Sequence, residues 1–313
     1  MDGSKRMAEL LVETGAYKDL DQPVILTSGE LGIYYVNTEK LVQDNGEFEK
    51  YGDSAKQMYE HALRMMDQHP TFKEAIEIIA QKVAEKIKTD GLKQPFISGG
   101  QRRDWLFSGP VAEILGCSCL HLYKQEKDLE RVDLISSGSG ILDYQGYLNG
   151  VNIIHIADLL TEGSSVYNVK DEKEIGWVPM IRQRGSNIKD LFTVVTRNQG
   201  GEQRLAEQGI ATHSFVSIDE AFLKEHSKNP DRAVAYIKNP RQWCEDYLKE
   251  NGALRFNYDL DPLSPKFERA KKFLARYGEF LEKVGKMDEL KFSFNAGYPD
   301  YAHLYYEVFG GKK

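Results

Sequence analysis

The chain has 313 residues, of which 41% are hydrophobic, 28% charged and 11% aromatic. This composition is typical of a globular protein, and the sequence excludes a membrane-spanning helix because it contains no run of about 18 apolar residues. With 41 basic and 48 acidic residues the net charge is −7, which argues against sequence-independent binding to nucleic acid or to anionic membranes.

The N-terminus and the cysteines indicate the compartment. Residues 1–17 have an acidic second position and no apolar core followed by small residues, so they do not resemble a signal peptide. Cys117 and Cys119 lie in a stretch of strand character, far from Cys244. Three cysteines cannot all pair and supply too few ligands for a zinc site. We therefore expect a cytoplasmic protein, since reducing compartments disfavour disulfides.

The first 90 residues predict helices and one hairpin. Apolar residues at helical spacing predict a short helix over residues 5–16. Residues 23–41 contain two β-rich runs around a Ser-Gly-Glu-Leu-Gly turn, which predicts a hairpin. The periodic segment 54–89 breaks at His69-Pro70 and therefore predicts two consecutive helices.

Strands and helices alternate beyond residue 94, a pattern typical of βαβ units with a parallel sheet. Strand-like runs occupy residues 95–100, 117–124, 151–160, 190–197 and 211–220, and helical runs occupy 105–116, despite Pro110, and 200–209. Residues 127–150 are rich in Gly, Ser and Asp and are expected to be mobile. After Glu220 the sequence predicts helices separated by Asn-Pro, Asn-Gly and Asp-Pro pairs.

The most informative segment is residues 151–168. A buried strand is predicted to end at Ala157-Asp158, a polar loop follows, and a helix is expected to begin near Ser165. Backbone N–H groups at a helix N-terminus, with hydroxyl groups around Gly163, form a phosphate site. Asp158 stands at the carboxyl end of the strand, where open α/β sheets bind ligands. The alternative is an ordinary turn in which Ser and Thr only cap the helix.

This segment resembles the phosphoribosyl-pyrophosphate (PRPP) motif of type I phosphoribosyltransferases, in which a hydrophobic strand leads to two acidic residues, two apolar residues and a Thr-Thr-Gly-Gly-Ser loop. Four further segments are similar, in the same order, to motifs of orotate phosphoribosyltransferase; they span residues 26–41, 122–128, 144–150 and 194–210. The resemblance covers about residues 5–220, with insertions near 46–75 and 170–188.

The resemblance implies an α/β fold with a parallel sheet flanked by helices, a small N-terminal hood and a helical C-terminal extension. It implies a phosphoribosyltransferase-like domain over residues 1–220, with the insertion at about 46–75, and the extension over 221–313. The implied activity is transfer of phosphoribose from PRPP to orotate or a similar base in pyrimidine nucleotide biosynthesis, with Mg²⁺ as cofactor. The implied partners are these small molecules and a second copy of the chain in a homodimer, with no nucleic acid and no membrane.

The same resemblance implies two catalytic residues and a phosphate-binding loop. Asp158 would contact the ribose hydroxyls of PRPP. Lys127, with Lys124, would lie on a loop that closes over the pyrophosphate and reaches the partner subunit. The residues expected to hold the 5′-phosphate are Thr161, Gly163, Ser164 and Ser165. No residue is assigned as a direct metal ligand.

Two residues are assigned to the base by the resemblance. Arg197 would pair with the carboxylate of orotate, and Tyr35 would line the base pocket. Each also has a simpler interpretation, because Arg197 can be a surface charge at a strand end, Tyr35 a core aromatic, and Lys127 a solvated loop charge.

Several positions depart from the family pattern. Ala157 replaces the first acidic residue of the motif, Glu162 its second threonine, and Thr27 a lysine of the N-terminal segment. A carboxylate about 4 Å from a phosphate charge costs on the order of 4 kcal/mol at an effective dielectric near 20. Glu162 must therefore point away or be neutralised, and Arg102 and Arg103 are candidates for the compensating charge.

Two alternatives stand beside an active enzyme. One is a non-catalytic relative that binds PRPP or a nucleotide as a sensor or scaffold, which Ala157 and Glu162 favour. The other is a DNA-binding regulator on the same fold, against which the acidic charge and the lack of a basic recognition helix argue. A fused orotidylate decarboxylase is excluded, because residues 221–313 are too few for a (β/α)₈ barrel of about 250 residues.

Overall fold

The computed structural model describes residues 2–124, 131–136, 140–144, 146–304 and 308–309. The chain divides into two compact units, one of Met1–Tyr17 and Val36–Phe222, the other of Lys18–Tyr35 and Leu223–Lys313. The segment 18–35 thus groups with the C-terminal helices. That residues 1–220 and 221–313 are separate domains stays a prediction.

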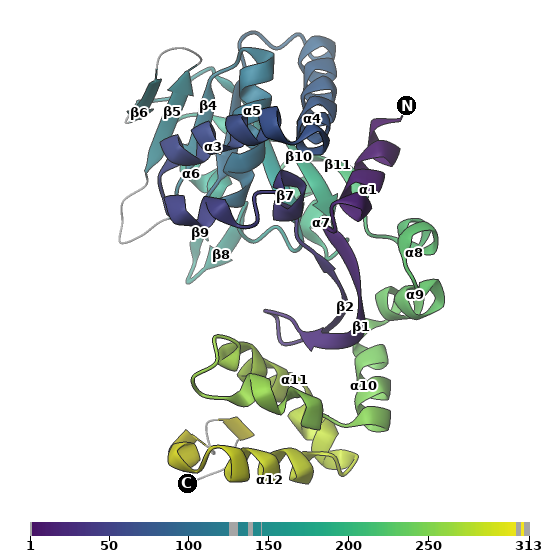
Figure 1. The fold of residues 1–313 in the computed structure, drawn as a ribbon. Coiled ribbons are helices and arrows are strands. Elements are labelled where there is room, and N and C mark those ends of the chain that lie inside the picture. The colour runs from purple at the N-terminus through teal and green to yellow at the C-terminus, as the bar shows by residue number, and fades with distance from the viewer. Residues whose placement is uncertain (1, 125–130, 137–139, 145, 305–307, 310–313) are drawn as a thin grey trace. The chain divides into compact units, whose positions relative to one another are not determined.

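A seven-stranded sheet forms the centre of the first unit (Figure 1). Its strand order is β11-β10-β7-β3-β4-β5-β6, and the five strands from β11 to β4 are parallel, as predicted. The bounds are β3 (Phe96–Gly100), β4 (Cys119–Leu122), β5 (Val132–Ser136), β6 (Gly140–Asp143), β7 (Asn152–Leu160), β10 (Asn187–Thr196) and β11 (Ala211–Ser217).

The sequence missed β5 and β6, which lie in the stretch expected to be mobile. Both pair in antiparallel fashion, β5 with β4 and β6 with β5. Each has only four or five residues, and pairing with β4 and β5 places them in the sheet. The sequence did not predict these strands, and that the segment is mobile stays a prediction.

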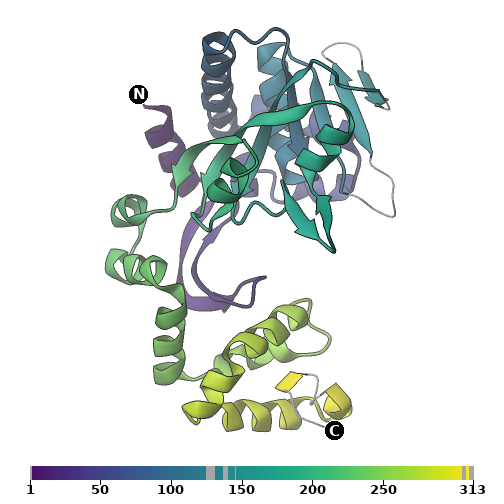
Figure 2. The same cartoon turned by 180° about the vertical axis from the view of Figure 1, so that it is seen from behind.

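Helices cover both faces of the sheet. Figures 1 and 2 show α3, α4 and α5 on one face and α6 and α7 on the other. The break predicted at His69-Pro70 is confirmed, because Pro70 begins α4, where a missing N–H costs nothing. The bounds are α1 (Gly3–Glu13), α2 (Glu39–Val42), η1 (Glu47–Tyr51), α3 (Ala55–Gln68), α4 (Pro70–Thr89), α5 (Arg103–Leu115), α6 (Trp177–Gln183) and α7 (Gly201–Ala206).

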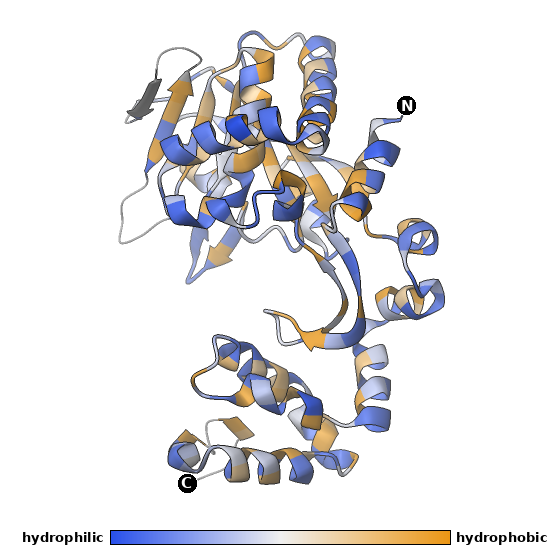
Figure 3. Ribbon diagram, viewed as in Figure 1, coloured by the Kyte–Doolittle hydropathy of each residue, from blue (hydrophilic) through white to orange (hydrophobic). Residues whose placement is uncertain are grey.

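The apolar core of this unit lies between the sheet and its helices. Figure 3 shows the apolar residues concentrated on the strands. Strand β7 is buried without interruption from Ile153 to Asp158, which explains why its sequence is an apolar run and not an alternation. Trp105, Phe107 and Phe192 are at most 1% exposed. The core fixes the strand ends, and so the loops that follow them.

The helix expected near Ser165 is absent, and this prediction was wrong. A hairpin of β8 (Asn168–Lys170) and β9 (Lys173–Ile175) follows instead, and α6 begins at Trp177. Asp171 and Glu172, with φ of 50° and 63°, form its two-residue turn, a conformation that the charged sequence did not signal. The phosphate loop therefore precedes a hairpin.

The second unit consists of a hairpin, which the sequence analysis had placed in the domain over residues 1–220, and the helices predicted after Glu220. Asn229 and Asn239 cap α9 and α10, which start at prolines, so the Asn-Pro pairs mark helix starts. Tyr34 packs edge-on against Tyr236 at 5.9 Å between ring centroids. The elements that contribute to this unit are β1 (Tyr17–Ile25), β2 (Leu31–Val36), α8 (Glu220–His226), α9 (Pro230–Lys238), α10 (Pro240–Asn251), η2 (Leu254–Leu260), α11 (Phe267–Lys283), α12 (Met287–Gly297) and η3 (Pro299–Leu304).

Across the described residues of both units, none of the helices is long and apolar enough to cross a membrane.

Candidate active site at the carboxyl edge of the sheet

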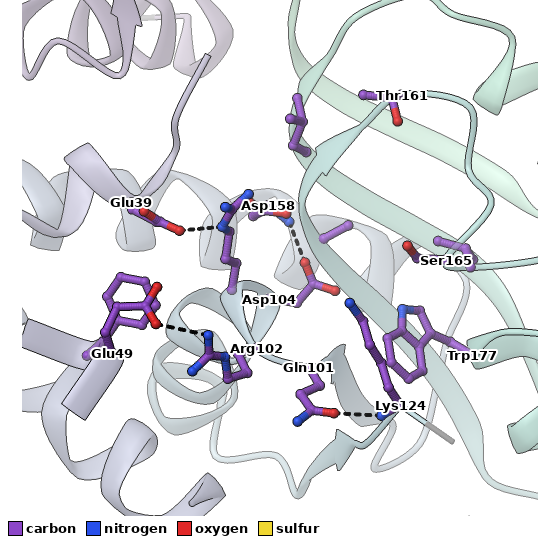
Figure 4. Close-up of a pocket in the computed structure, with 15 residues that line it drawn as sticks. Glu39, Glu49, Gln101, Arg102, Asp104, Lys124, Asp158, Thr161, Ser165 and Trp177 are labelled. Carbon is purple, nitrogen blue, oxygen red and sulfur yellow. Dashed lines mark hydrogen bonds and ion pairs between the residues drawn. The ribbon is translucent and has the colours of Figure 1, made fainter. Parts of the chain in front are cut away.

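A cavity of about 380 Å³ lies at the carboxyl ends of β3, β4 and β7 in the first unit (Figure 4). Parallel strands end at one edge, so loops distant in sequence meet there. The segment around α2 and η1 completes the wall. The lining residues are Glu39, Phe48, Glu49, Gln101, Arg102, Arg103, Asp104, Lys124, Ala157, Asp158, Leu159, Thr161, Ser165, Val166 and Trp177.

Asp158 lies on the cavity wall near the end of β7. Its side chain is buried, and the Thr38 hydroxyl donates to Oδ2 at 2.6 Å. Burial, and then the nearby Asp104 carboxylate, raise the pKa of Asp158 to about 7, while the bond from Thr38 opposes this. An acidic residue in a cavity whose pKa is shifted close to 7 is a candidate for contact with substrate.

Asp104 is a site residue that the sequence reasoning missed. Its Oδ1 accepts the backbone N–H of Asp158 at 2.9 Å, and its Oδ2 accepts the N–H of Gly100 at 3.0 Å. Figure 4 shows Asp104 directed toward Asp158. One sequence feature could have identified Asp104: it is an acidic residue in the first turn of a helix that follows a glycine-rich strand end. Helix N-termini favour negative charge.

Two arginines follow β3 and are paired across the cavity. Arg102 donates to Glu49 at 2.9 Å, and Arg103 pairs with Glu39. The peptide bond between Gln101 and Arg102 is cis. These arginines were proposed as compensation for Glu162. Instead they pair with acidic residues of α2 and η1, and Glu162 is exposed and absent from the described lining of the cavity.

The predicted phosphate loop forms a tight turn beside Asp158. Thr161 and Ser165 line the cavity, and Gly163 has φ of 72°, which favours glycine. The N–H groups of Val166 and Tyr167 both donate to the Gly163 carbonyl at 3.0 Å. The turn thus places hydroxyl groups at the cavity, although no helix starts at Ser165.

A second cavity of about 250 Å³ adjoins this turn. Its lining includes Ser164, Ser165, Lys124 and Trp177. Trp177 also lines the first cavity, and its indole packs so closely on Gly100 that a Cβ at that position would overlap the ring. Glycine at position 100 is therefore required by the packing of Trp177.

Lys124 is the one predicted lysine that the structure describes. It follows β4 and lines both cavities, and its backbone N–H donates to Gln101 Oε1 at 2.8 Å. Lys127 lies outside the described residues. The structure therefore brings Lys124 together with Asp158, Thr161 and Ser165.

The two residues assigned to the base lie elsewhere. Arg197 follows β10, and its N–H donates to the Leu160 carbonyl at 2.9 Å; it does not line the cavity within the described residues. Tyr35 belongs to β2 in the second unit and is 47% exposed. Their roles toward a base stay predictions.

Metal ligands are sparse in the described part of the chain, where no three His, Cys, Asp or Glu side chains are grouped to hold an ion. Asp104 and Asp158 supply two neighbouring carboxyl groups at the cavity. A hard cation such as Mg²⁺ takes oxygen ligands and commonly keeps several waters and substrate phosphates. The site therefore suits Mg²⁺ that is bound mainly through a phosphorylated ligand.

No family model matches the chain. Orotate phosphoribosyltransferase of Pyrococcus furiosus is 21% identical over 202 residues, which cover 63% of this chain and 85% of that protein. Adenine phosphoribosyltransferase of Pectobacterium atrosepticum is 29% identical over 144 residues, 44% of this chain and 72% of that protein. The crystal structure of orotate phosphoribosyltransferase from Aeropyrum pernix matches 70% of this chain and 97% of its own, with 15% identity and a TM-score of 0.44.

The two sequence relatives are named for different bases, orotate and adenine, and share phosphoribosyl transfer. Their matches confirm the resemblance that the motifs indicated. The chain is a distant relative of the type I phosphoribosyltransferases.

Proposed function

We propose that the protein transfers phosphoribose from PRPP to orotate or a similar base, in pyrimidine nucleotide biosynthesis. One observation carries the proposal: a buried carboxyl group, Asp158, shares a cavity with the hydroxyl-bearing turn at Thr161 and Ser165 and with the basic loop at Arg102 and Arg103. PRPP has the matching parts in the same order, namely ribose hydroxyls, a 5′-phosphate and a pyrophosphate.

Each group of the site has a physical task in this proposal. The carboxylate of Asp158 accepts hydrogen bonds from the ribose hydroxyls, and the turn at Thr161–Ser165 binds the 5′-phosphate through its N–H and hydroxyl groups. Arg102 and Arg103 bind the pyrophosphate as planar bidentate donors. To do so they leave Glu49 and Glu39, exchanging a carboxylate for a more highly charged anion.

The transition state explains why these charges matter. Cleavage at the anomeric carbon gives an oxocarbenium-like sugar and a departing pyrophosphate, so a carboxylate near the ribose and cations at the leaving group both stabilise developing charge. Mg²⁺ that enters with PRPP would neutralise part of the pyrophosphate charge. Lys124 and Lys127 complete the cationic side.

The proposal also specifies the base that is bound and the oligomeric state. Arg197 binds the carboxylate of orotate, while the role of Tyr35, in the second unit, stays a prediction. The protein acts as a homodimer in which Lys127 reaches the partner's cavity. Light scattering tests the dimer, because a monomer at assay concentration removes the role of Lys127 in the partner.

The decisive assay mixes protein, Mg²⁺ and PRPP with either orotate or adenine and follows pyrophosphate release. We expect turnover with orotate, seen also as loss of orotate absorbance, and its strong reduction in Asp158→Asn and Lys127→Ala. Asp190→Asn is the matched control, since Asp190 is a buried carboxylate that contacts His213 at 2.8 Å outside the cavity. Turnover with adenine alone would overturn the choice of base.

A second candidate is a PRPP sensor without turnover. It is favoured by Ala157, which is 4% exposed and supplies no carboxylate, and by the neutralisation of Arg102 and Arg103 by acidic partners. Calorimetry with PRPP separates the two: saturable binding without pyrophosphate release supports the sensor, and absence of binding excludes both.

A further inference from the structure

The carboxylate of Asp104 connects the ends of β3 and β7, the two strands that lead into the loops of the proposed site. Its Oδ2 accepts the N–H of Gly100 at 3.0 Å, at the end of β3, and its Oδ1 accepts the N–H of Asp158 at 2.9 Å, near the end of β7. Asp104 itself lies in the first turn of α5. One side chain thus ties two strands and a helix together at the cavity.

This bridge lies where direct pairing of β3 with β7 has ended. The last register pair joins Ser98 to His155. Gly100 and Asp158 lie a few residues further along, where the two strands separate around the cavity. Their backbone donors need acceptors because this part of the chain is buried, and Asp104 accepts from both. Beyond the last register pair, Asp104 therefore connects the two strand ends.

A buried histidine faces the same carboxylate. His155 Nε2 lies 3.7 Å from Asp104 Oδ2, and its Nδ1 lies 2.9 Å from the Ser98 hydroxyl oxygen. His155 and Ser98 are 0% exposed, so the packing fixes the ring. The Nε2 atom of His155 is buried and has no hydrogen-bond partner among the described residues, and the Asp104 carboxylate lies beside it.

We propose that Asp104 is a positioning residue that sets the distance between the pyrophosphate loop at Gly100–Arg103 and the ribose carboxylate of Asp158. The inference rests on the proposed function in one respect only: PRPP must span both loops.

The geometry predicts that a change at Asp104 affects the affinity for long and short ligands differently. Ribose 5-phosphate contacts only the Asp158 side, and pyrophosphate contacts only the arginine side. PRPP contacts both, and its advantage over either fragment depends on the separation of the two loops. A change in the bridge therefore weakens PRPP selectively, whereas a general loss of structure weakens all three ligands.

The test substitution is Asp104→Asn in the full-length protein. The asparagine keeps one acceptor oxygen but turns its NH₂ group toward one of the two backbone N–H groups, which breaks half of the bridge. With Mg²⁺ present, calorimetry should show PRPP binding weakened about ten-fold or more, and ribose 5-phosphate and pyrophosphate changed by less than about three-fold. The value of kcat/KM for PRPP should fall with the PRPP affinity.

Two further variants make the experiment decisive. Asp104→Glu keeps both acceptor oxygens but moves them by one methylene, so the selective loss for PRPP should be smaller than in Asp104→Asn. This variant also serves if Asp104→Asn does not fold. Asp190→Asn removes a buried carboxylate that has its own histidine and Lys86 at 3.1 Å, outside the cavity, and should leave all three affinities unchanged.

The outcomes separate the inference from the function. Selective weakening of PRPP supports the inference, whether or not the wild-type protein turns PRPP over. Equal weakening of all three ligands, or wild-type affinities in both Asp104 variants, overturns it while leaving the proposed function standing. If the wild-type protein binds none of the three ligands, both are overturned.

Discussion

Two buried carboxylates in the first unit, Asp44 and Asp158, have opposite surroundings. Asp44 Oδ1 accepts the N–H of Gly46 at 2.9 Å, and its Oδ2 accepts the N–H of Phe48 at 3.0 Å and lies 2.7 Å from His61 Nε2. Asp158 accepts from the Thr38 hydroxyl and has a second carboxylate, Asp104, beside it on a cavity wall.

This difference distinguishes a carboxylate with a structural role from one that is available to bind a ligand. The oxygens of Asp44 are occupied in fixing the turn between α2 and η1. Asp158 is buried with a like charge nearby, an arrangement that raises its pKa and that a hydroxyl-bearing or cationic ligand relieves. We expect Asp44 to contribute to stability and Asp158 to binding.

The largest effect is expected for Asp44→Ala. It leaves two backbone N–H groups and the buried His61 ring without their acceptor, and removal of one partner from such a buried network costs about 3–5 kcal/mol of unfolding free energy. Urea unfolding followed by circular dichroism measures this. A loss below about 1 kcal/mol would mean that water replaces the carboxylate and that the comparison is wrong.

Asp158→Asn is expected to give the reverse pattern. Replacing the carboxylate removes the repulsion from Asp104, so the unfolding free energy should stay the same or rise. The loss of a charge-assisted bond to the ribose should lower kcat/KM for PRPP about ten- to a hundred-fold. Steady-state kinetics and urea unfolding of the same preparation give both quantities. An unstable variant with unchanged kinetics would reverse the assignment.

The pH dependence of stability gives a further test of the surroundings of Asp158. The folded protein keeps a proton on Asp158 up to about pH 7, whereas the unfolded chain releases it near pH 3.8. Between these values the folded state binds more protons, so the contribution of Asp158 to stability falls as pH rises, by at most about 1.4 kcal/mol per pH unit. Asp158→Asn should lack this decline. Parallel stability curves for the two proteins would show that Asp158 is ionised in the folded state.

The smallest effect is expected for the acidic partners of the arginines. Glu49→Gln removes a carboxylate that competes with pyrophosphate for Arg102, and because exposed pairs contribute about 0.2–1 kcal/mol, affinity for pyrophosphate should rise about 1.4- to five-fold. Glu47→Gln is the control, since Glu47 pairs with Lys50 at 2.7 Å on the same short helix. If calorimetry gives the Glu49 and Glu47 variants equal affinities for pyrophosphate, Glu49 does not compete for the site.

The fold was largely predictable because its central strands are long apolar runs. Strand β7 is buried on both faces, so its sequence carries the signal by itself. The short strands from β5 to β9, apart from β7, were missed because each has only three to five residues, too few for a clear pattern. Their conformation comes from pairing with a neighbour, which a local sequence pattern does not record.

The site was predictable where a recognised motif contained its residues, as for Lys124 after β4 and for the loop after β7. Asp158, Thr161 and Ser165 follow one strand, and the strand-loop pattern identified them. Thr38 and Asp104 belong to distant segments, and Thr38 is separated from Asp158 by 120 positions in the chain. Their proximity arises from the parallel sheet and its covering helices, so no spacing in the sequence could have identified it.

The packing of Trp177 on Gly100 has an optical consequence. The chain contains three tryptophans, and Trp177 lines the candidate cavity, while Trp105 is fully buried with its Nε1 bonded to the Gly99 carbonyl. A molecule that enters the cavity changes the polarity next to the Trp177 indole. With Trp105 and Trp243 replaced by phenylalanine, the protein would carry a single tryptophan, at its candidate active site, and occupancy could be followed by its selectively excited emission without any attached label.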